Sequence, residues 1–330
     1  MSAHAETPRT TLGARLTGLV ERVGIHNASL ILALIALLVL FGILRGDVFF
    51  SSRNILNIGM GVAILGVLAI SQTAVIVSGG LDISVGAIVG LTTVSTAMAI
   101  DATGWAAAGP LAGVAIGAAA GLFNGLVITY GRVNAIIVTL GTMAIFRGIA
   151  FIISNGQSIS IFNDTFRLLG IGRFLGLPAP IWVLIGVAVL FYIFLHKSIV
   201  GRNIYAIGGN PVVARLSGMD IKRYRVGMYV LSGMVAGIGG ILLAARTGSG
   251  QPISGSEGLE LEAITAAFLG GCAMQGGKGT VIGALLGVAI IGILNNGMIL
   301  TGVPTFYQML AKGSLLILAV LLAEYRLNRS

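Results

Sequence analysis

Long uninterrupted runs of apolar residues recur along the whole chain, and they constrain its fold more than any other feature. The runs ASLILALIALLVLFGIL at 28–44 and IWVLIGVAVLFYIFL at 181–195 approach the roughly 20 apolar residues that cross a bilayer as a helix. Charged residues make up only 9% of the chain, too few to give a soluble helical protein its polar faces. The sequence therefore predicts an all-α, polytopic membrane protein.

Ten apolar segments can be delimited, and together they form one predicted transmembrane domain over residues 28–323. The eighth is too short, at about 1.5 Å of rise per residue, to cross a bilayer as an ordinary helix. We interpret it as a half-membrane or re-entrant element, which is stable only where protein or water satisfies its backbone. Residues 1–27 and 324–330 are predicted to be an N-terminal segment and a short tail. The segments are 28–44, 55–78, 84–100, 105–130, 135–154, 179–196, 226–245, 260–272, 279–299 and 306–323.

The distribution of lysine and arginine orients these segments. Ten crossings place both termini on one side of the membrane. If that side is the cytoplasm, thirteen of the 20 basic residues lie on the cytoplasmic side and five on the outer side. Basic residues favour cytoplasmic loops, so this orientation is the predicted one. Residues 197–225, which hold six basic residues, are then a cytoplasmic loop, and residues 155–178 form the longest outer loop.

Several functions are disfavoured by what the chain lacks. GGKGT at 276–280 does not match a phosphate-binding loop, because Cys272 stands where the first glycine is needed and Gly279 follows Lys278. The single cysteine and three scattered histidines predict neither a disulfide nor a metal site, and no cofactor is expected. The net charge of +9 is attributed to the bias of cytoplasmic loops and not to nucleic-acid binding.

Ionisable residues within the apolar segments are few. Glu260 and Glu262 stand at the start of the eighth segment, and Asp82 lies in the break GGLDISVG. Arg147 and Lys312 are expected to be isolated charges that reach a helix end. An ion-coupled carrier usually holds acidic or paired ionisable groups within the membrane, so the chain is predicted to draw its energy from another subunit. An ion-coupled secondary transporter of a small polar solute stays open as the alternative.

The basic loop contains a short helix with recognisable end signals. Asn210 is a good N-cap, Pro211 suits the first helical position, and Gly218 suits the left-handed residue after a helix end. Residues 211–217 are therefore predicted to form about two turns with one apolar face. A helix this short is marginal alone in water, so it needs a surface to pack on. That surface is either lipid headgroups, for a linker, or a groove on a cytoplasmic partner, for a docking helix.

Four stretches of the chain resemble the permease subunits of ribose-type sugar ABC importers, a family that includes permeases for xylose, galactose, arabinose, rhamnose and the autoinducer-2 signal. YAIGGNPVVARLSGMDIKRYR (205–225) is similar to the family's cytoplasmic coupling loop, and VIVSGGLDISVGAIVGL (75–91) to its Gly-Asp-Ser-Gly break. VNAIIVTLGTMAIFRGIAFIISNGQSI (133–159) and EAITAAFLGGCAMQGGKGTVIGALLGVAIIGILNNGMILTGV (262–303) are similar to later hallmarks. The stretches occur in the family's order, and the likeness covers roughly residues 50–325.

The resemblance implies an ABC importer permease fold and a role in transport rather than catalysis. Two permease subunits, identical or paralogous, would pair in the lipid bilayer of the inner membrane with both termini cytoplasmic. Cytoplasmic ATPase subunits would hydrolyse ATP, and a periplasmic sugar-binding protein would deliver a monosaccharide or similar small polyol. The segment CAMQ at 272–275 departs from the small polar residues usual near the expected pore, which leaves open which sugar is carried.

The resemblance assigns the helix of the basic loop to contact with the ATPase, and Ala214 is expected to lie against or near the ATPase surface. The predicted coupling residues are Asn210, Pro211, Val212, Val213, Ala214, Arg215, Leu216, Ser217 and Gly218.

Polar residues within the segments are candidates for the translocation path, because sugar hydroxyls need hydrogen-bonding partners. Alternatively, each of them cross-links helices by hydrogen bonds. The path candidates are Gln72, Asn124, Thr142, Asn295 and Asn296. Structural breaks are predicted at Gly79, Gly80, Asp82, Gly86, Gly276 and Gly277, and glycines at four-residue spacing elsewhere predict close helix packing.

Overall fold

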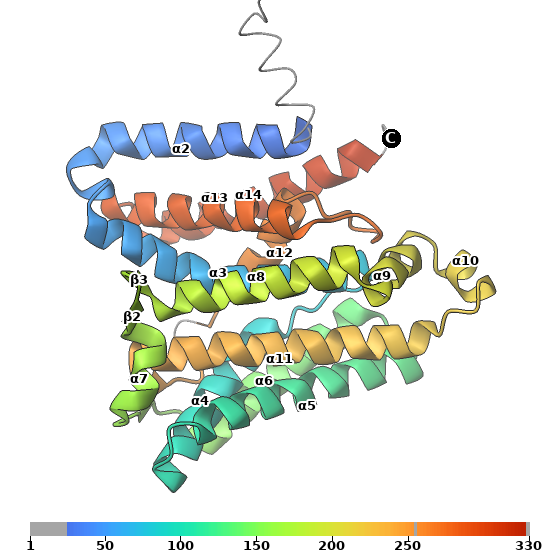
Figure 1. Ribbon diagram of the computed structural model, residues 1–330, viewed down its shortest axis with the longest axis horizontal. Helices are drawn as coiled ribbons and strands as arrows, with labels where there is room; N and C mark the ends of the chain where they lie inside the picture. Colours follow the sequence, from blue (N-terminus) through green and yellow to red (C-terminus); the bar gives the residue numbers. More distant parts are fainter. Residues whose placement is uncertain (1–24, 254–255, 328–330) are drawn as a thin grey trace, which may run out of the picture.

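The computed structural model describes residues 25–253 and 256–327 as a bundle of helices that lie side by side (Figure 1). Within those residues, nine helices are long and apolar enough to cross a membrane, which confirms the predicted polytopic all-α fold. These helices are α2 (Ile25–Phe49), α3 (Ser52–Val77), α4 (Val85–Thr103), α5 (Ala108–Tyr130), α6 (Ala135–Ser154), α8 (Ala179–Lys197), α11 (Ile221–Thr247), α13 (Val281–Leu300) and α14 (Thr305–Leu327). Their bounds match the predicted segments to within a few residues.

The ends of these helices carry local signals in the sequence. The side chains of Ser51 and Thr280 accept hydrogen bonds from backbone N–H groups at the starts of α3 and α13, as N-cap residues do. Gly104 and Gly248 end α4 and α11 in the left-handed conformation, with φ of 67° and 68°. Local residue chemistry therefore accounts for where these helices begin and end.

The eighth predicted segment forms α12 (Leu259–Leu269), a helix of only 11 residues. At about 1.5 Å per residue, α12 crosses roughly half of a bilayer's apolar core, as expected for a short element. The chain reaches α12 from β4 (Ser249–Gly250), which pairs antiparallel with β1 (Ile159–Ser160). Helix α12 is therefore too short to cross a bilayer alone, and the half-membrane or re-entrant interpretation stays a prediction.

Short elements that the sequence did not predict lie in the connections. Helix α7 (Asp164–Ile171) and the strand pair β2 (Arg173–Phe174) and β3 (Leu177–Pro178) fill the predicted outer loop. In the predicted cytoplasmic loop, α9 (Ile199–Gly209) precedes α10 (Pro211–Leu216). The start of α2 and the end of α14 lie toward the same end of the bundle as α9 and α10 (Figure 1). Residues 1–24 and 328–330, most of the two predicted terminal segments, lie outside the described residues.

Helices α3, α4 and α11 form the buried centre, whereas α2 and α14 lie at the edge and expose most of their apolar residues. Glycines allow a close backbone contact between α5 and α11. Gly117 of α5 and Gly233 of α11 each place their backbone where a Cβ of the other would be, and Gly121 lies equally close to the carbonyl of Tyr229. This close approach follows from the glycine spacing in the sequence.

Candidate coupling and translocation site

Helix α10 is short and held by its caps. The Asn210 side chain accepts hydrogen bonds from the backbone N–H groups of Val212 and Val213, both at 3.1 Å. Gly218 follows the helix with a φ of +82°, a conformation that favours glycine. The helix contains six residues, slightly fewer than the two turns predicted for 211–217.

The two faces of α10 have different surroundings. Ala214 is only 3% exposed and packs in a small cluster with Ile207 and Ile221. The expectation that Ala214 faces a partner is therefore wrong, because this side chain attaches α10 to the rest of the chain. The outward face is apolar instead, with Val212, Val213 and Leu216 exposed by 67%, 56% and 83%.

Just before α10, five glycines bring three separate parts of the chain into backbone contact, and we call them the glycine junction: Gly79, Gly208, Gly209, Gly276 and Gly277. The N–H of Gly277 donates to the carbonyl of Val77 at 2.9 Å. A Cβ on Gly208 would collide with that carbonyl and lie 2.6 Å from the nitrogen of Gly277. The end of α9 is therefore wedged between the break after α3 and the turn before α13.

Between α3 and α4 the chain runs non-helically, and Asp82 lies fully buried within this stretch. One carboxylate oxygen of Asp82 accepts from the backbone N–H of Ser84 at 3.0 Å and from its hydroxyl at 2.6 Å. The other oxygen accepts from the Ser232 hydroxyl of α11 at 2.8 Å. Hydrogen bonds from the chain itself thus stabilise a non-helical stretch at membrane depth.

Side chains of three helices hold this break in place. The Gln72 amide of α3 donates to the carbonyl of Asp82 at 2.8 Å, and the Asn124 amide of α5 donates to the Ser84 hydroxyl at 2.8 Å. The Tyr229 hydroxyl of α11 donates to the carbonyl of Leu81 at 3.1 Å. Gln72 and Asn124 are both fully buried at the break, and their place in the translocation path stays a prediction.

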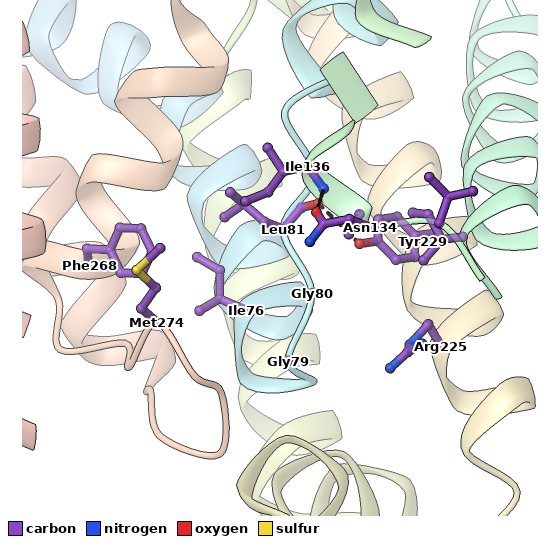
Figure 2. A pocket seen from close by; sticks show the side chains of 13 residues that line it. Ile76, Gly79, Gly80, Leu81, Asn134, Ile136, Arg225, Tyr229, Phe268 and Met274 are labelled. Atoms are coloured by element: carbon purple, nitrogen blue, oxygen red, sulfur yellow. Dashed lines mark hydrogen bonds between the residues drawn. The ribbon is translucent and has the colours of Figure 1, made fainter. Parts of the chain in front are cut away.

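A cavity of about 310 Å³ adjoins the break (Figure 2). Its wall includes Gly79 and Gly80 of the glycine-rich break, Arg225 of α11, and Phe268 and Met274 near the end of α12. Figure 2 shows the break between Phe268 and Met274 on one side and Tyr229 on the other. Met274 belongs to the CAMQ segment, so this departure from the family pattern lies at the cavity. We call this space the break cavity.

The remaining path candidates lie apart from the break cavity. Thr142 is buried and donates to the carbonyl of Thr139 within its own helix, at 3.3 Å. The amides of Asn296 and Asn54 exchange two hydrogen bonds, at 2.8 and 3.0 Å, which join α13 to α3. Of these candidates, Asn295 lines a second cavity.

The second cavity, of about 530 Å³, holds the charges that were expected to be isolated. Lys312 pairs with Glu262 at 2.6 Å, and Arg147 lies 3.9 Å from Glu260. Both acids lie in the first turn of α12, so the packing of α12 against its neighbours provides the partners. Among the described residues, neither this cavity nor any other place has a cluster of His, Cys, Asp and Glu that could hold a metal ion.

Known proteins resemble this chain over most of its length. A family described as "Branched-chain amino acid transport system / permease component" matches residues 54–320. The chain belongs to this permease family. The permease is 42% identical to the L-arabinose ABC transporter permease protein of Azospirillum brasilense, over 88% of the permease and 86% of that protein.

Two ribose import permease proteins are similarly close. The permease is 40% identical to that of Escherichia coli K12, over 88% of the permease and 92% of the relative. It is 41% identical to that of Bacillus subtilis 168, over 88% and 90% of the two chains. No solved structure matches the permease.

Proposed function

We propose that the permease is the membrane subunit of an ATP-driven importer for a monosaccharide, and that a cytoplasmic ATPase subunit docks on α10. The relatives, which are named as ribose and arabinose permeases, support the sugar and the class of transporter. The observation that carries the docking step is the outward apolar face of α10, made by Val212, Val213 and Leu216. Exposed apolar side chains on a capped helix outside the membrane spans are typical of a helix that enters a partner's groove.

The glycine junction gives this docking a route to the membrane. Because Gly208 contacts the backbone on both sides of it, a displacement of α9 and α10 must move Val77 or Gly277 as well. Val77 is the last residue of α3, and the break that follows it forms part of the wall of the break cavity. Closure of the ATPase would therefore shift this wall and release the sugar toward the cytoplasm.

The full assembly contains further partners. We propose two permease subunits, identical or paralogous, in the inner membrane, a binding protein that delivers the sugar on the outside, and both chain ends in the cytoplasm. The positions of the described chain ends, toward the end of the bundle that carries α10, support this orientation (Figure 1).

Reconstitution tests the proposal. Proteoliposomes containing the permease and its ATPase should take up radiolabelled D-ribose or L-arabinose only when ATP is on the α10 side and the sugar-binding protein is on the other. Proteoliposomes with the permease alone should take up neither sugar under a proton or sodium gradient. Uptake driven by such a gradient would reject the ATP-driven importer in favour of ion coupling.

A further inference from the structure

The second cavity lies between α6, α12, α13 and α14, in the half of the bundle away from α10, and we call it the polar cavity. Arg147 and Asn295 lie in the second halves of α6 and α13, and both helices run away from the end that carries α10. Glu260 and Glu262 come from the first turn of α12, and Lys312 comes from α14. Four separate helices thus direct polar groups to one space at the same depth of the bundle.

One charge pair in the polar cavity is closely bonded. Lys312 donates to one oxygen of Glu262 at 2.6 Å, and the Asn295 amide donates to the other oxygen at 3.3 Å. Both carboxylate oxygens of Glu262 therefore have donors. This pair holds α14 and α13 against α12, as expected for ionisable groups inside a membrane protein.

The second charge pair is loose. Arg147 Nη2 lies 3.9 Å from Glu260 Oε1, which is too far for a direct hydrogen bond. Within the described residues, Arg147 Nε and Nη2, Glu260 Oε2 and Asn295 Oδ1 are buried and have no hydrogen-bond partner. Glu260 as a whole is only 6% exposed. Each buried polar atom without a partner costs about 1–3 kcal/mol, so two donors and two acceptors of this kind indicate a site that something else completes.

The neighbouring helix makes room for this carboxylate. A Cβ on Gly86, in the first turn of α4, would collide with Glu260 Oε2. Ser256 also approaches the same glycine with its carbonyl, at 3.0 Å from that Cβ position. The glycine therefore keeps Glu260 inside the bundle, beside the polar cavity.

We propose that the polar cavity is a binding station for a neutral, hydroxyl-rich solute, in which Arg147 and Glu260 share one solute hydroxyl. A hydroxyl both accepts and donates, so its oxygen bridges a donor and an acceptor 3.9 Å apart. Arg147 and Glu260 would turn from each other toward that hydroxyl. The proposal rests on the proposed function, to which it adds a named site in the half of the membrane where the sugar enters.

The charge and size of the polar cavity favour this class of solute. Three carboxylates, including Glu257, and two cationic side chains line it, so an anionic solute would meet a net negative charge. A volume of about 530 Å³ lies within the range of roughly 300–1,000 Å³ that is common for small-molecule sites. A free monosaccharide is uncharged and presents several hydroxyl groups in that space.

Cysteine protection tests the site without disturbing Arg147 or Glu260. In a Cys272→Ala background, which removes the only native cysteine, Met309→Cys places a thiol on the cavity wall. D-Ribose or L-arabinose should slow its modification by N-ethylmaleimide severalfold in purified permease, whereas D-ribonate, an anion of similar size, should not. Equal protection by D-ribonate, or protection by neither sugar, would overturn the proposal.

Substitutions then test the two residues proposed to bind the solute hydroxyl, Arg147 and Glu260. Glu260→Gln and Arg147→Lys should each raise the sugar concentration for half-protection about tenfold, the loss expected for one charge-assisted hydrogen bond. Asp164→Asn, at an exposed acid of α7, is the matched control and should change nothing. Gel filtration must show that each variant stays folded. Unchanged protection in both Glu260→Gln and Arg147→Lys would refute the role of these residues in binding the sugar. If the sugars still protect the thiol at position 309 but wild-type proteoliposomes import neither sugar, the proposed importer function is rejected and the binding site is not.

Discussion

Replacing Leu216 with glutamate should separate docking from folding. This side chain is 83% exposed on the outward face of α10, so it contributes little to the permease itself. An exposed substitution of this kind typically changes stability by no more than about 0.5 kcal/mol. Leu216→Glu should therefore leave the amount of permease in the membrane and its melting temperature unchanged.

The loss at the ATPase interface should be far larger. Burying a leucine side chain is worth about 1.5–3 kcal/mol, and a carboxylate forced into the same groove adds a desolvation penalty of several kcal/mol. A total above about 3 kcal/mol weakens binding by more than roughly a hundredfold. The ATPase should no longer co-purify with the variant, and ATP-driven sugar uptake in proteoliposomes should be lost.

Two further variants make the result interpretable. Ile199→Glu, at an exposed residue of α9, is a matched control and should keep both docking and uptake. Ala214→Glu should instead destabilise the permease, because Ala214 is buried against Ile207 and Ile221. Full ATPase binding and uptake in Leu216→Glu would show that the ATPase does not dock on the apolar face of α10. The proposed coupling route through the glycine junction would then also be rejected.

Three other perturbations test separate parts of the structure. Gly208→Val should abolish uptake, because its side chain would collide with the backbone of the break after α3; normal uptake in proteoliposomes would contradict the glycine junction. Asp82→Ala should lower stability by about 2–3 kcal/mol, seen as a lower melting temperature in detergent, because the hydroxyl and backbone donors that bind its carboxylate lose their acceptor. With Cys272→Ala as background, Gln157→Cys should react with an impermeant maleimide from outside intact cells and Arg223→Cys should not, and the reverse pattern would invert the topology.

The sequence alone was sufficient wherever structure depends on neighbouring residues. Apolar runs of about 20 residues placed the membrane spans, because a helix in a membrane satisfies its own backbone whatever surrounds it. The caps of α10 were equally local, since Asn210 bonds to N–H groups two and three residues away. Helices α7 and α9 are short and contain polar residues, so no long apolar run in the sequence predicts them.

Only the tertiary structure decided which residues meet across the bundle. Arg147 and Lys312 appeared isolated in sequence, yet each has an acid of α12 beside it. Glu260 is more than 100 positions from Arg147, and Glu262 is 50 positions from Lys312. Ala214 turned inward for the same reason, because the direction of its helix face depends on where α9 and α11 lie. Composition and periodicity set which elements form, but the partners of a side chain follow from how those elements pack, and that packing is a property of the whole chain.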